Sequence, residues 1–467
     1  DFELIVNGGF APLNGFLDKT DYDGVVTNMR LDNGALWSMP ITLCITEVMA
    51  DKLESEKYVL LENETGLLLG LMDISSSSSI YKPDIVKESI NVYGGDDENH
   101  PYVKILKEYQ DDGKIYNLGG PIVKYEMPPR YDFKEHRRTP SETKKYFKDN
   151  GWTKIVGFQT RNPMHRSHYE LTKYALKIAG DEAKLLLHPV VGITQDCDIN
   201  YHLRVKCYKK LLNHYDDNVL LSLLPLTMRM AGPREAVWHA QIRKNYGCTH
   251  FVVGRDHAGP SYKRSITGED FYGPYDAQNL LLEHSEEIGI EVIVSKLIVY
   301  AEPKDVLLQP IYAPIDTINA EEYNIMNISG TKQREMLSKG EPLPSWFTFP
   351  EIADELTKAY KEQSSGFCLY FVGLSGSGKS TLANYVINKI NEISNKKITY
   401  LDGDVVRQEL SKGLSFSKED RSTNARRIGF VCAEVVKHGG IAIASNIAPY
   451  LSDRKHNKNR IGENGIY

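Results

Sequence analysis

Strands are predicted where short, largely apolar runs are bounded by glycine or polar residues. Three such runs are Phe367–Val372, Ile155–Phe158 and Thr249–Val253. Continuous apolar character over four to six residues is typical of a strand buried in a parallel sheet. Two more runs, Tyr58–Leu61 and Gly66–Leu71, lie in a region of short β-prone segments separated by Gly and Asn.

Helices are predicted where apolar residues recur at a spacing of three or four. Tyr169–Ile178 follows the strand at Ile155–Phe158, Leu382–Ile390 follows the strand at Phe367–Val372, and Pro350–Tyr360 stands apart. For the first helix the predicted inward residues are Leu171, Tyr174, Ala175 and Ile178. Two strand–loop–helix units therefore lie about two hundred residues apart, as in alternating α/β folds.

Four domains are predicted from these elements. A β-rich domain covers residues 1–135, an alternating α/β domain 136–315, a small connecting domain 316–362, and a second α/β domain 363–467. Glu362–Gly366 is interpreted as the linker before the last domain. Because only about one hundred residues follow it, we expect that domain to be incomplete.

Composition indicates ordinary protein cores and favours neither nucleic acid nor a membrane as a partner. The 467 residues are 41% hydrophobic and carry a net charge of −6. Basic residues are mixed among acidic ones, and no apolar run is long enough to span a membrane. The cysteines lack CxxC pairs, which favours a reducing compartment; they are Cys44, Cys197, Cys207, Cys248, Cys368 and Cys432. We expect the cytoplasm, or a plastid if a transit peptide was trimmed ahead of Asp1.

A phosphate-binding loop is predicted between the strand ending at Val372 and the helix beginning near Leu382. The stretch fits G-x-x-x-x-G-K-[ST], and its flanking strand and helix are the context that this motif needs. Glycines let backbone N–H groups surround phosphate oxygens, and the helix dipole favours negative charge. A Gly/Ser-rich linker is the alternative, but it does not explain the flanking elements. The predicted triphosphate-binding residues are Gly373, Leu374, Ser375, Gly376, Ser377, Gly378, Lys379, Ser380 and Thr381. Lys379 is expected to reach the outer phosphates and Ser380 to hold Mg²⁺.

A second dense cluster, Gly157–His168, follows the strand at Ile155–Phe158. His165 and His168 are three residues apart and would share one face of the first helical turn, and Pro163 would lie near its start. Three interpretations compete for the histidines: a zinc site, two structural histidines, and a clamp for an anion. Zinc needs a third ligand, and no Cys or Glu stands at a matching spacing. Gln159, Arg161 and Arg166 at the same strand end favour the clamp, because guanidinium groups bind oxyanions in bidentate fashion.

Two further segments rich in glycine and basic residues, Met228–His239 and Val253–Pro260, lie in the same region. Each is a weak signal alone, since Gly and Pro occur in loops generally. Gly254 comes directly after a predicted strand, where a ligand can approach the backbone, and Arg255 and His257 could meet phosphate. Together with Gly157–His168 they describe strand ends of an α/β sheet, where such folds bind ligands.

At these residues the chain resembles ATP sulfurylases. The resemblance rests on Gln159–His168, Ala231–Ala236 and Gly254–Pro260, and it extends through Asn7–Phe16, Leu36–Leu43, His100-Pro101 and Asn327–Thr331. It implies a β-rich, barrel-like (PUA-like) N-terminal domain, a Rossmann-like nucleotidyltransferase domain and a small α/β connecting domain. It also implies that ATP and sulfate are joined to give adenosine 5′-phosphosulfate (APS) and pyrophosphate, with Mg²⁺ accompanying ATP, in a homo-oligomer.

Site residues are carried over from the resemblance position by position. The residues implied in catalysis are Thr160, Arg161, Asn162, His165 and His168, with the two histidines stabilising the phosphates and the leaving pyrophosphate. Those implied in sulfate binding are Gln159, Arg161 and Ala258. Those implied in ATP binding are Gln159, Thr160, Arg161, Asn162, Gly254, Arg255, Asp256, His257 and Ile298.

The C-terminal part resembles APS kinases, beyond the phosphate-binding loop itself. The residues that carry this likeness include Leu401–Asp404 and Ser445–Tyr450, with Asn446 as a minor departure. The resemblance implies a P-loop kinase domain that phosphorylates the 3′-hydroxyl of APS, with Mg²⁺ near Ser380 and Asp402. The residues implied in APS binding are Asp402, Asp404, Arg407, Phe416, Arg421 and Asn424. Ser445 is implied in catalysis, as a position where the family can carry a phosphoserine.

Two hypotheses for the C-terminal domain stay open at this point: a second catalytic domain, or a regulatory domain that binds nucleotide on a single-function sulfurylase. The complete phosphate-binding loop and Asp402–Asp404 favour catalysis. A third possibility, an unrelated nucleotidyltransferase that shares only H-x-x-H, does not explain Gln159, Arg161 and Gly254–Pro260 together.

Overall fold

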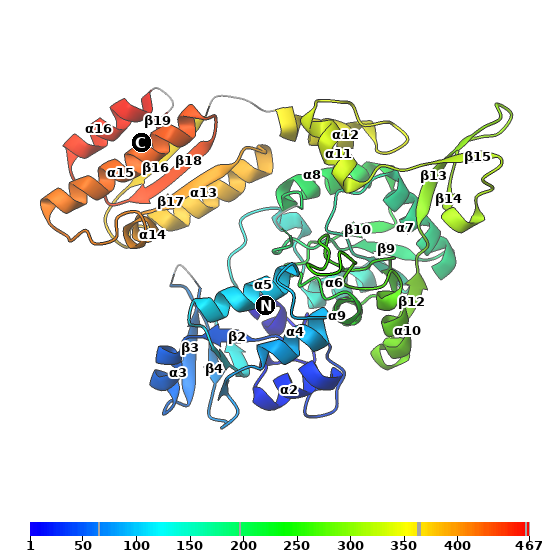
Figure 1. Cartoon of the computed structure of the whole chain (residues 1–467), viewed down its shortest axis with the longest axis horizontal. Helices are drawn as coiled ribbons and strands as arrows, with labels where there is room; N and C mark the ends of the chain where they lie inside the picture. Colours follow the sequence, from blue (N-terminus) through cyan, green and yellow to red (C-terminus); the bar gives the residue numbers. More distant parts are fainter. Residues whose placement is uncertain (64–65, 196–197, 362–365, 463–464, 467) are drawn as a thin grey trace. The chain divides into compact units, whose positions relative to one another are not determined.

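The computed structural model describes residues 1–63, 66–195, 198–361, 366–462 and 465–466 (Figure 1). Its contacts form two compact units, each described here by itself. The first consists of residues 1–129, 135–329 and 344–349, and the second of 130–134, 330–343 and the chain from Pro350 onward. Most of the predicted linker (362–365), Cys197 and Tyr467 lie outside the described residues, and the four domain boundaries stay a prediction.

Residues 1–126 form two small antiparallel sheets flanked by helices, with strand orders β1-β7-β4-β3 and β2-β6-β5. The strands are β1 Gly15–Phe16, β2 Leu43–Ile45, β3 Tyr58–Glu62, β4 Leu68–Asp73, β5 Ile80–Tyr81, β6 Tyr116–Leu118 and β7 Gly120–Lys124. The helices are α1 Phe2–Val6, α2 Lys19–Asn28, α3 Glu47–Leu53, α4 Ile85–Tyr93 and α5 Pro101–Asp111. The strands predicted at Tyr58–Leu61 and Gly66–Leu71 are confirmed as β3 and β4. β4 begins later than predicted because the N–H of Gly66 bonds the carbonyl of Asn63 (2.9 Å) to close a turn.

A five-stranded parallel sheet follows, with order β10-β9-β8-β11-β12. Its strands are β8 Ile155–Phe158, β9 Lys184–Leu187, β10 Val219–Leu221, β11 His250–Val253 and β12 Glu291–Val294. The helices of this region are α6 Pro140–Asp149, α7 Arg166–Ala179, α8 Tyr201–Leu211, α9 Pro233–Asn245 and α10 Asp276–Ile288, with short 3₁₀ turns η1 Lys134–His136 and η2 Leu212–His214. The chain adds β9 and β10 on one side of β8 and then β11 and β12 on the other. The carboxyl ends of β8 and β11 therefore border the point where the strand order reverses, which is where open α/β sheets bind ligands.

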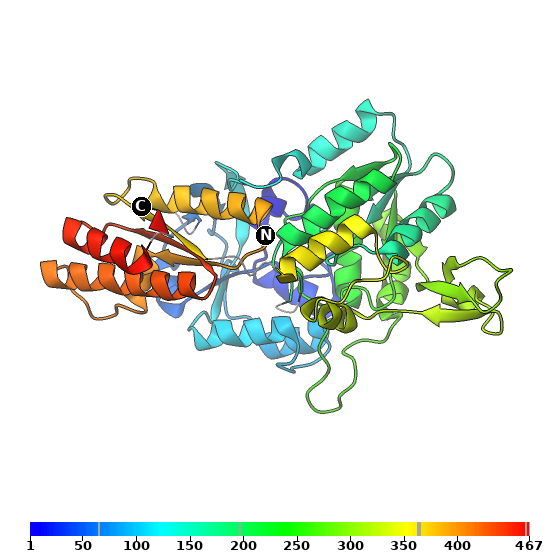
Figure 2. The same cartoon turned by 90° about the horizontal axis from the view of Figure 1, so that it is seen from above.

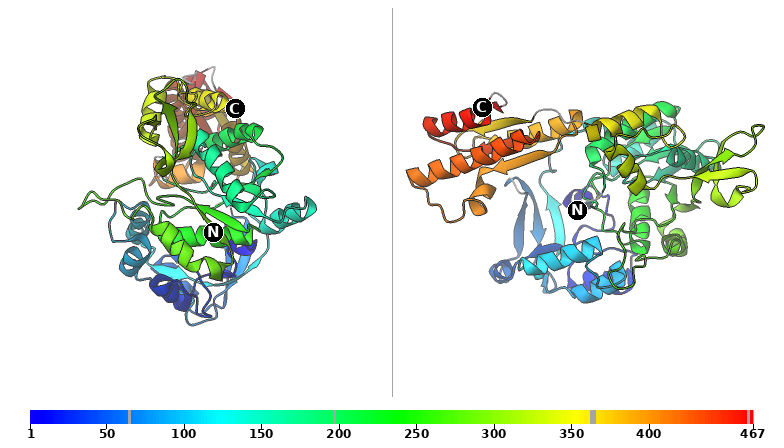
Figure 3. Two further views of the ribbon diagram at one scale, coloured as in Figure 1. Left: turned by 90° about the vertical axis from the view of Figure 1, so that its right-hand side faces the viewer. Right: turned by 45° about the horizontal axis from the view of Figure 1, so that its top comes forward.

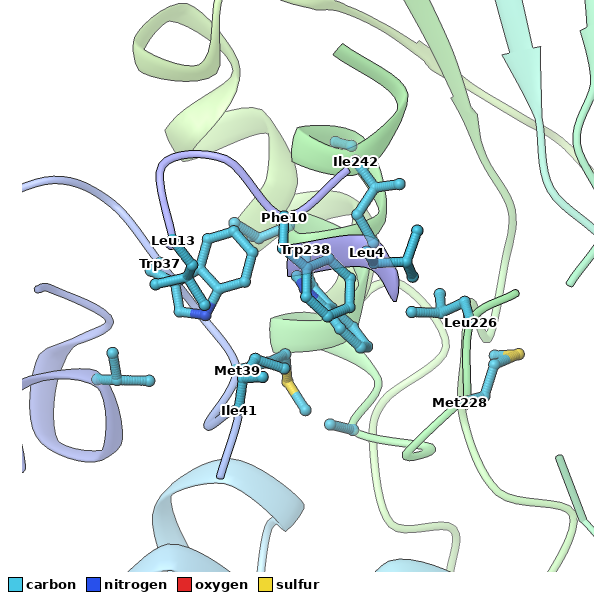
Figure 4. Packing of buried hydrophobic residues seen from close by; sticks show 14 of the residues in the cluster. Leu4, Phe10, Leu13, Trp37, Met39, Ile41, Leu226, Met228, Trp238 and Ile242 are labelled. Carbon is cyan, nitrogen blue, oxygen red and sulfur yellow. The ribbon is translucent and has the colours of Figure 1, made fainter. Parts of the chain in front are cut away.

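One continuous hydrophobic core runs from the N-terminal residues to the parallel sheet. The ring of Phe10 contacts Trp37 and, on α9, Trp238, with ring centroids 5.8 and 5.2 Å apart (Figure 4). α9 also packs tightly on β8: a Cβ at Gly157 would lie 3.0 Å from the Arg243 side chain. The sheet that carries the site is thus fixed against α9.

A three-stranded antiparallel sheet, order β14-β13-β15, extends away from the parallel sheet within the same unit (Figure 3). Its strands are β13 Ile298–Pro303, β14 Ile311–Pro314 and β15 Tyr323–Met326, with the 3₁₀ turn η3 Ile315–Thr317. β13 starts at Ile298, so one end of this sheet reaches the site described below.

The second unit holds a four-stranded parallel sheet, order β17-β18-β16-β19. Its elements are α11 Gly330–Ser338, α12 Pro350–Lys361, β16 Phe367–Val372, α13 Lys379–Ile393, β17 Ile398–Asp402, α14 Gly403–Gln408, α15 Lys418–Lys437, β18 Ile441–Asn446, α16 Leu451–Ile461 and β19 Gly465–Ile466. α13 covers one face of the sheet, and α15 and α16 cover the other (Figure 2). Alternate residues of β16 pack on opposite faces of the sheet. Phe367 and Leu369 pack toward α13, and Cys368 and Tyr370 pack toward α15. The predicted strand–loop–helix unit is confirmed.

The helix predicted at Tyr169–Ile178 is confirmed as α7, but its inward face is rotated from the prediction. Ile178 is 52% exposed, whereas Thr172, Ala175 and Ala179 are buried. The hydroxyl of Thr172 is drawn inward by hydrogen bonds with the carbonyl of Tyr169 (2.7 Å) and a neighbouring Tyr hydroxyl (2.6 Å). The expectation for Pro163 was also wrong: α7 begins at Arg166 with His165 as N-cap, so the proline lies ahead of the first turn.

Candidate active sites

The loop after β8 is held in place by its own side chains. Thr160 is 8% exposed, its hydroxyl accepts a hydrogen bond from the N–H of Asn162 (3.1 Å), and it donates one to the carbonyl of the same residue (3.0 Å). The sequence offered no separate role for Thr160. The structure shows that it closes the turn which presents Arg161.

Two side chains of α8 hold the main chain of the same loop, and neither was predicted from the sequence. Arg204, 2% exposed, donates to the carbonyl of Arg161 (2.8 Å), and the hydroxyl of Tyr208 donates to the carbonyl of Asn162 (2.7 Å). The two residues are four apart and therefore share one helix face. That spacing was visible in the sequence, but nothing there linked it to a loop some forty residues earlier.

The guanidinium of Arg161 is oriented by a partner that was not predicted. One terminal nitrogen lies 2.8 Å from Oδ2 of Asp198, and the other donates to the carbonyl of Gly259 (3.2 Å). Both side chains of the ion pair are mostly buried. Among the described residues these contacts engage two of the five N–H groups of the guanidinium, and three remain for an oxyanion.

The two histidines have different environments. The backbone N–H of His165 donates to Nδ1 of His168 (3.3 Å), so the proton of a neutral His168 ring resides on Nε2. Burial lowers the pKa of His168 to about 4, and the ring is therefore neutral at pH 7. His165 is 5% exposed, and its ring stacks on Phe347 at a centroid distance of 4.1 Å.

The loop after β11 is tied to the N-terminus of α9. The N–H of Gly232, the N-cap of α9, donates to the carbonyl of Ala258 (3.2 Å). The N–H of Asp256 donates to the carbonyl of Pro274, just ahead of α10 (2.9 Å). Asp256 and Ala258 both have φ of 55°, in the left-handed region. Such a backbone costs free energy and persists only where surrounding contacts hold it, as commonly happens at binding loops.

A cavity of about 290 Å³ brings the two loops together. Every residue that the resemblance implied in adenylyl transfer lines it except His165. Arg166, which was expected in the anion clamp, also lies outside the wall, and its Nε donates to the carbonyl of Ser345 (2.6 Å). The predicted residues in its wall are Gln159, Thr160, Arg161, Asn162, His168, Gly254, Arg255, Asp256, His257, Ala258 and Ile298. The lining residues that were not predicted are Phe158, Ser167, Leu171, Met228, Val252, Ser295, Lys296 and Leu297. The wall therefore combines cationic, amide and imidazole groups suited to an anionic nucleotide.

In the second unit, the loop Gly373–Gly378 connects β16 to α13. Gly376 and Gly378 have φ of 72° and 81°, conformations that favour glycine. The amine of Lys379 donates to the carbonyl of Leu374 (2.7 Å) across this loop. The glycines and the lysine thus form the expected concave turn at a helix N-terminus.

Asp402, at the end of β17, gathers hydroxyl groups beside this loop. Its Oδ2 accepts hydrogen bonds from Ser380 (2.8 Å), Tyr400 (2.9 Å) and Ser445 (3.0 Å), and its Oδ1 accepts one from the backbone of Asp404 (2.9 Å). Burial opposes ionisation of Asp402, but these hydrogen bonds outweigh it and lower the pKa. Ser445 is 2% exposed, so its hydroxyl serves this network. Tyr400 was not predicted.

Apart from Asp402 and Asp404, the residues predicted for the acceptor nucleotide fall into two groups. The guanidinium of Arg407 lies 4.4 Å from the ring centroid of Phe416, and that of Arg421 lies 5.9 Å from it. Phe416 is 70% exposed, so these three residues form an open aromatic and cationic surface. Asn424 is instead buried in α15, 7% exposed.

Comparison with known proteins identifies the family. Over 472 residues the chain is 42% identical to the sulfate adenylyltransferase of Chaetomium globosum, which covers all of this chain and 79% of that protein. Its identity to the enzyme of Yarrowia lipolytica is also 42%, over all of this chain and 80% of the relative. The chain belongs to the sulfate adenylyltransferase family.

Family profiles match three stretches of the chain. A PUA-like domain matches residues 1–126, ATP-sulfurylase 134–359 and adenylylsulphate kinase 365–467. The solved structure described as the hexameric APS kinase from Thiobacillus denitrificans superposes with a TM-score of 0.62 and 29% identity, over 99% of this chain and 82% of that one. The predicted fold class is confirmed, and the family is one of sulfate activation.

Neither a membrane span nor a metal cluster is found in the part of the chain that the structure describes. No described helix is long and apolar enough to cross a membrane. No three His, Cys, Asp or Glu side chains among the described residues are grouped so as to bind a metal ion.

We expect His168→Ala to slow adenylyl transfer by about 100-fold, because the neutral ring offers an Nε2–H donor at the cavity wall. His165→Ala should affect stability more than rate, since its ring stacks on Phe347 outside the cavity. Rates of sulfate-dependent ATP–pyrophosphate exchange and thermal unfolding measure the two effects. Stoichiometric zinc in the wild type that is lost on either change would instead establish a metal site.

Proposed function

We propose that this chain activates sulfate in two steps. In the first, sulfate and ATP give APS and pyrophosphate; in the second, another ATP phosphorylates the 3′-hydroxyl of APS. The observation that carries the first step is the cavity in which the loops after β8 and β11 meet. The phosphate-binding loop beside Asp402 carries the second.

In the first step a sulfate oxygen attacks the α-phosphorus of ATP. The new S–O–P linkage forms as the bond from the α-phosphorus to the bridging oxygen breaks, and pyrophosphate carries that electron pair away. Sulfate is already anionic, so the step needs positioning and charge stabilisation more than a base. We assign sulfate to Gln159, the free N–H groups of Arg161 and the backbone of Ala258.

ATP would lie along the remaining wall of the same cavity. Thr160 and Asn162 shape the loop at its phosphates, and the Nε2–H of His168 stabilises the charge on the pyrophosphate that leaves. His165 acts through its backbone contact with His168 rather than on ATP. The segment Gly254–His257 and the side chain of Ile298 would hold the rest of the nucleotide.

In the second step the loop Gly373–Thr381 would bind ATP, with Lys379 on the outer phosphates. The exposed ring of Phe416 and its two guanidinium neighbours would hold APS, and Asp404 or Asp402 would orient its 3′-hydroxyl. In this proposal Ser445 holds Asp402 rather than carrying phosphate, because its hydroxyl is buried against that carboxylate.

Magnesium fits the oxygen groups beside the loop. The hydroxyl of Ser380 and the carboxylate of Asp402 lie 2.8 Å apart, and both are hard oxygen ligands of the kind that Mg²⁺ prefers. When bound with ATP, the ion would neutralise charge on the phosphates.

Assembly and compartment belong to the same proposal. The relative from Thiobacillus denitrificans is described as hexameric, which supports a homo-oligomer for this chain. Cys44, Cys248, Cys368 and Cys432 are free thiols, which fits the reducing compartment, cytoplasmic or plastidic, expected from the sequence.

The whole chain, incubated with ATP, Mg²⁺, labelled sulfate and inorganic pyrophosphatase, tests both steps at once. We expect labelled APS first and then its 3′-phosphorylated form. If label stops at APS, the second step is refuted for this chain, and if no labelled nucleotide forms, the first is refuted.

A further inference from the structure

Three side chains form a row that leads away from the cavity: His257, His239 and Glu235. Glu235 and His239 are four residues apart on α9 and both 0% exposed. Nδ1 of His239 lies within hydrogen-bond distance of Nε2 of His257 (3.0 Å). Nε2 of His239 lies 3.3 Å from Oε1 of Glu235, a charge contact without hydrogen-bond geometry among the described residues. Only His257 reaches the cavity wall. The row therefore leads from a buried acid to the proposed ATP site.

The acid end of the row is built for a carboxylate. Oε2 of Glu235 accepts the backbone N–H groups of Ala231 (2.8 Å) and Arg229 (3.3 Å), and Oε1 accepts Arg229 as well (3.1 Å). Burial raises the pKa of Glu235, while these donors and the buried guanidinium of Arg229 act against the rise. The negative charge faces Nε2 of His239 and favours a proton on that nitrogen.

The proton positions then follow along the row. With its proton on Nε2, a neutral His239 has only a lone pair on Nδ1, so His257 must donate its Nε2–H there. The remaining nitrogen of His257, Nδ1, is left as an acceptor. Such a ring cannot donate a hydrogen bond to a phosphate.

We propose that Glu235 and His239 are positioning residues that hold His257 as a neutral acceptor, and that His257 receives a hydrogen bond from a donor group of ATP. That group is either a ribose hydroxyl or the exocyclic amine of adenine. This inference rests on the proposed ATP site and changes one detail of it, because the sequence suggested that His257 meets phosphate.

Charges around the row keep His257 neutral. The ionisable groups that act on it are His239, Arg243, Glu235 and Arg161. Burial, reinforced by His239 and the two guanidinium groups, holds the pKa of His257 well below its usual value, and only Glu235 opposes this. The acceptor form should thus persist across the neutral pH range.

Glu235→Gln tests the row with little change of shape. The amide oxygen can take the place of Oε2 and keep both backbone donors, which puts the NH₂ group opposite Nε2 of His239. The row then reverses: His239 donates to His257, and Nδ1 of His257 becomes a donor. Glu291→Gln is the matched control, because Glu291 also contacts a histidine, His250 (3.1 Å), but is exposed and does not line the cavity.

Two measurements read the outcome in the whole chain. The ¹⁵N shifts of the imidazole nitrogens, assigned with a His257→Asn variant, report which nitrogen carries the proton. Calorimetry of Mg-ATP binding at pH 7, in chains whose kinase loop is inactivated by Lys379→Ala, should show at least a tenfold loss of affinity for Glu235→Gln and none for Glu291→Gln. In the same background without either change, binding of 2′-deoxy-ATP, 3′-deoxy-ATP and N6,N6-dimethyl-ATP distinguishes the ribose from the adenine donor, since only one class should weaken.

Each result bears on a different statement. If the chain that carries Lys379→Ala alone does not bind Mg-ATP, the proposed ATP site itself is wrong. If it binds all three analogues as tightly as ATP, or if wild-type His257 carries its proton on Nδ1, the inference is overturned while the ATP site stands. The inference is also overturned if a folded Glu235→Gln variant carries the His257 proton on Nδ1 and still binds Mg-ATP with unchanged affinity. The analogue and wild-type ¹⁵N measurements do not require the variant to fold.

Discussion

Arg161→Ala should reduce sulfate-dependent ATP–pyrophosphate exchange by about 30- to 1,000-fold, which corresponds to ~2–4 kcal/mol of lost transition-state stabilisation. The guanidinium lies in the cavity wall with its plane set by Asp198 and the carbonyl of Gly259, so no nearby neutral group can replace it. Arg161→Lys should recover little activity, because a lysine restores the charge but not the planar fork.

Arg30→Ala is the matched control, since Arg30 also forms an ion pair, with Glu287, but at the surface. Exposed pairs of this kind contribute about 0–1 kcal/mol, and exchange should be unchanged. Asp198→Asn provides a second check: it should lower activity less than Arg161→Ala while raising the sulfate KM. Near-normal exchange in Arg161→Ala, with the fold intact by circular dichroism, would refute the sulfate assignment.

Lys379→Ala should lower the rate of APS phosphorylation at least ~100-fold and leave the rate of APS synthesis unchanged. The amine bridges the phosphate-binding loop in the second unit, and the cavity for adenylyl transfer lies wholly in the first. Effects of a charge deletion at one site should therefore add independently to those at the other.

Lys389→Ala, on the same helix α13, is the control, because its amine pairs with Glu392 and has no part in the loop. The regulatory alternative makes the opposite forecast. It expects no kinase turnover in the wild type, with Lys379→Ala altering only inhibition by the 3′-phosphorylated product. Kinase turnover in the wild type and its loss in Lys379→Ala would exclude that alternative.

Local signals in the sequence predicted strands and loops well. β8 and β16 were placed at the correct residues because each is a short apolar run that is followed at once by polar or glycine residues, which leaves little choice of boundary. The inward face of α7 was predicted less well. There, a buried hydroxyl at Thr172 takes a place that hydrophobicity alone would give to Ile178.

The supporting residues of the site could not be found in the same way. Asp198, Arg204 and Tyr208 contact the loop after β8 across some forty residues of sequence. Glu235 and His239 lie within a segment that was singled out for its glycine and arginine, yet their connection to His257 depends on how α9 packs beside β11. Contacts of this kind arise from the tertiary fold, and single-sequence patterns carry no trace of them.

The hydrogen bonds that hold the main chain of the two loops affect which positions of the site can vary during evolution. Arg204, Tyr208 and the N–H of Gly232 all bond to main-chain carbonyls, not to the side chains that face the cavity. Every amino acid supplies that carbonyl. Apart from Thr160, whose hydroxyl closes the loop after β8, side chains along the wall can thus be exchanged without loosening the scaffold. Replacement of Arg204 or Tyr208 would instead displace several wall positions together. Diversification of substrate choice should accordingly concentrate at wall positions such as Met228 and Ile298, while α8 stays constant.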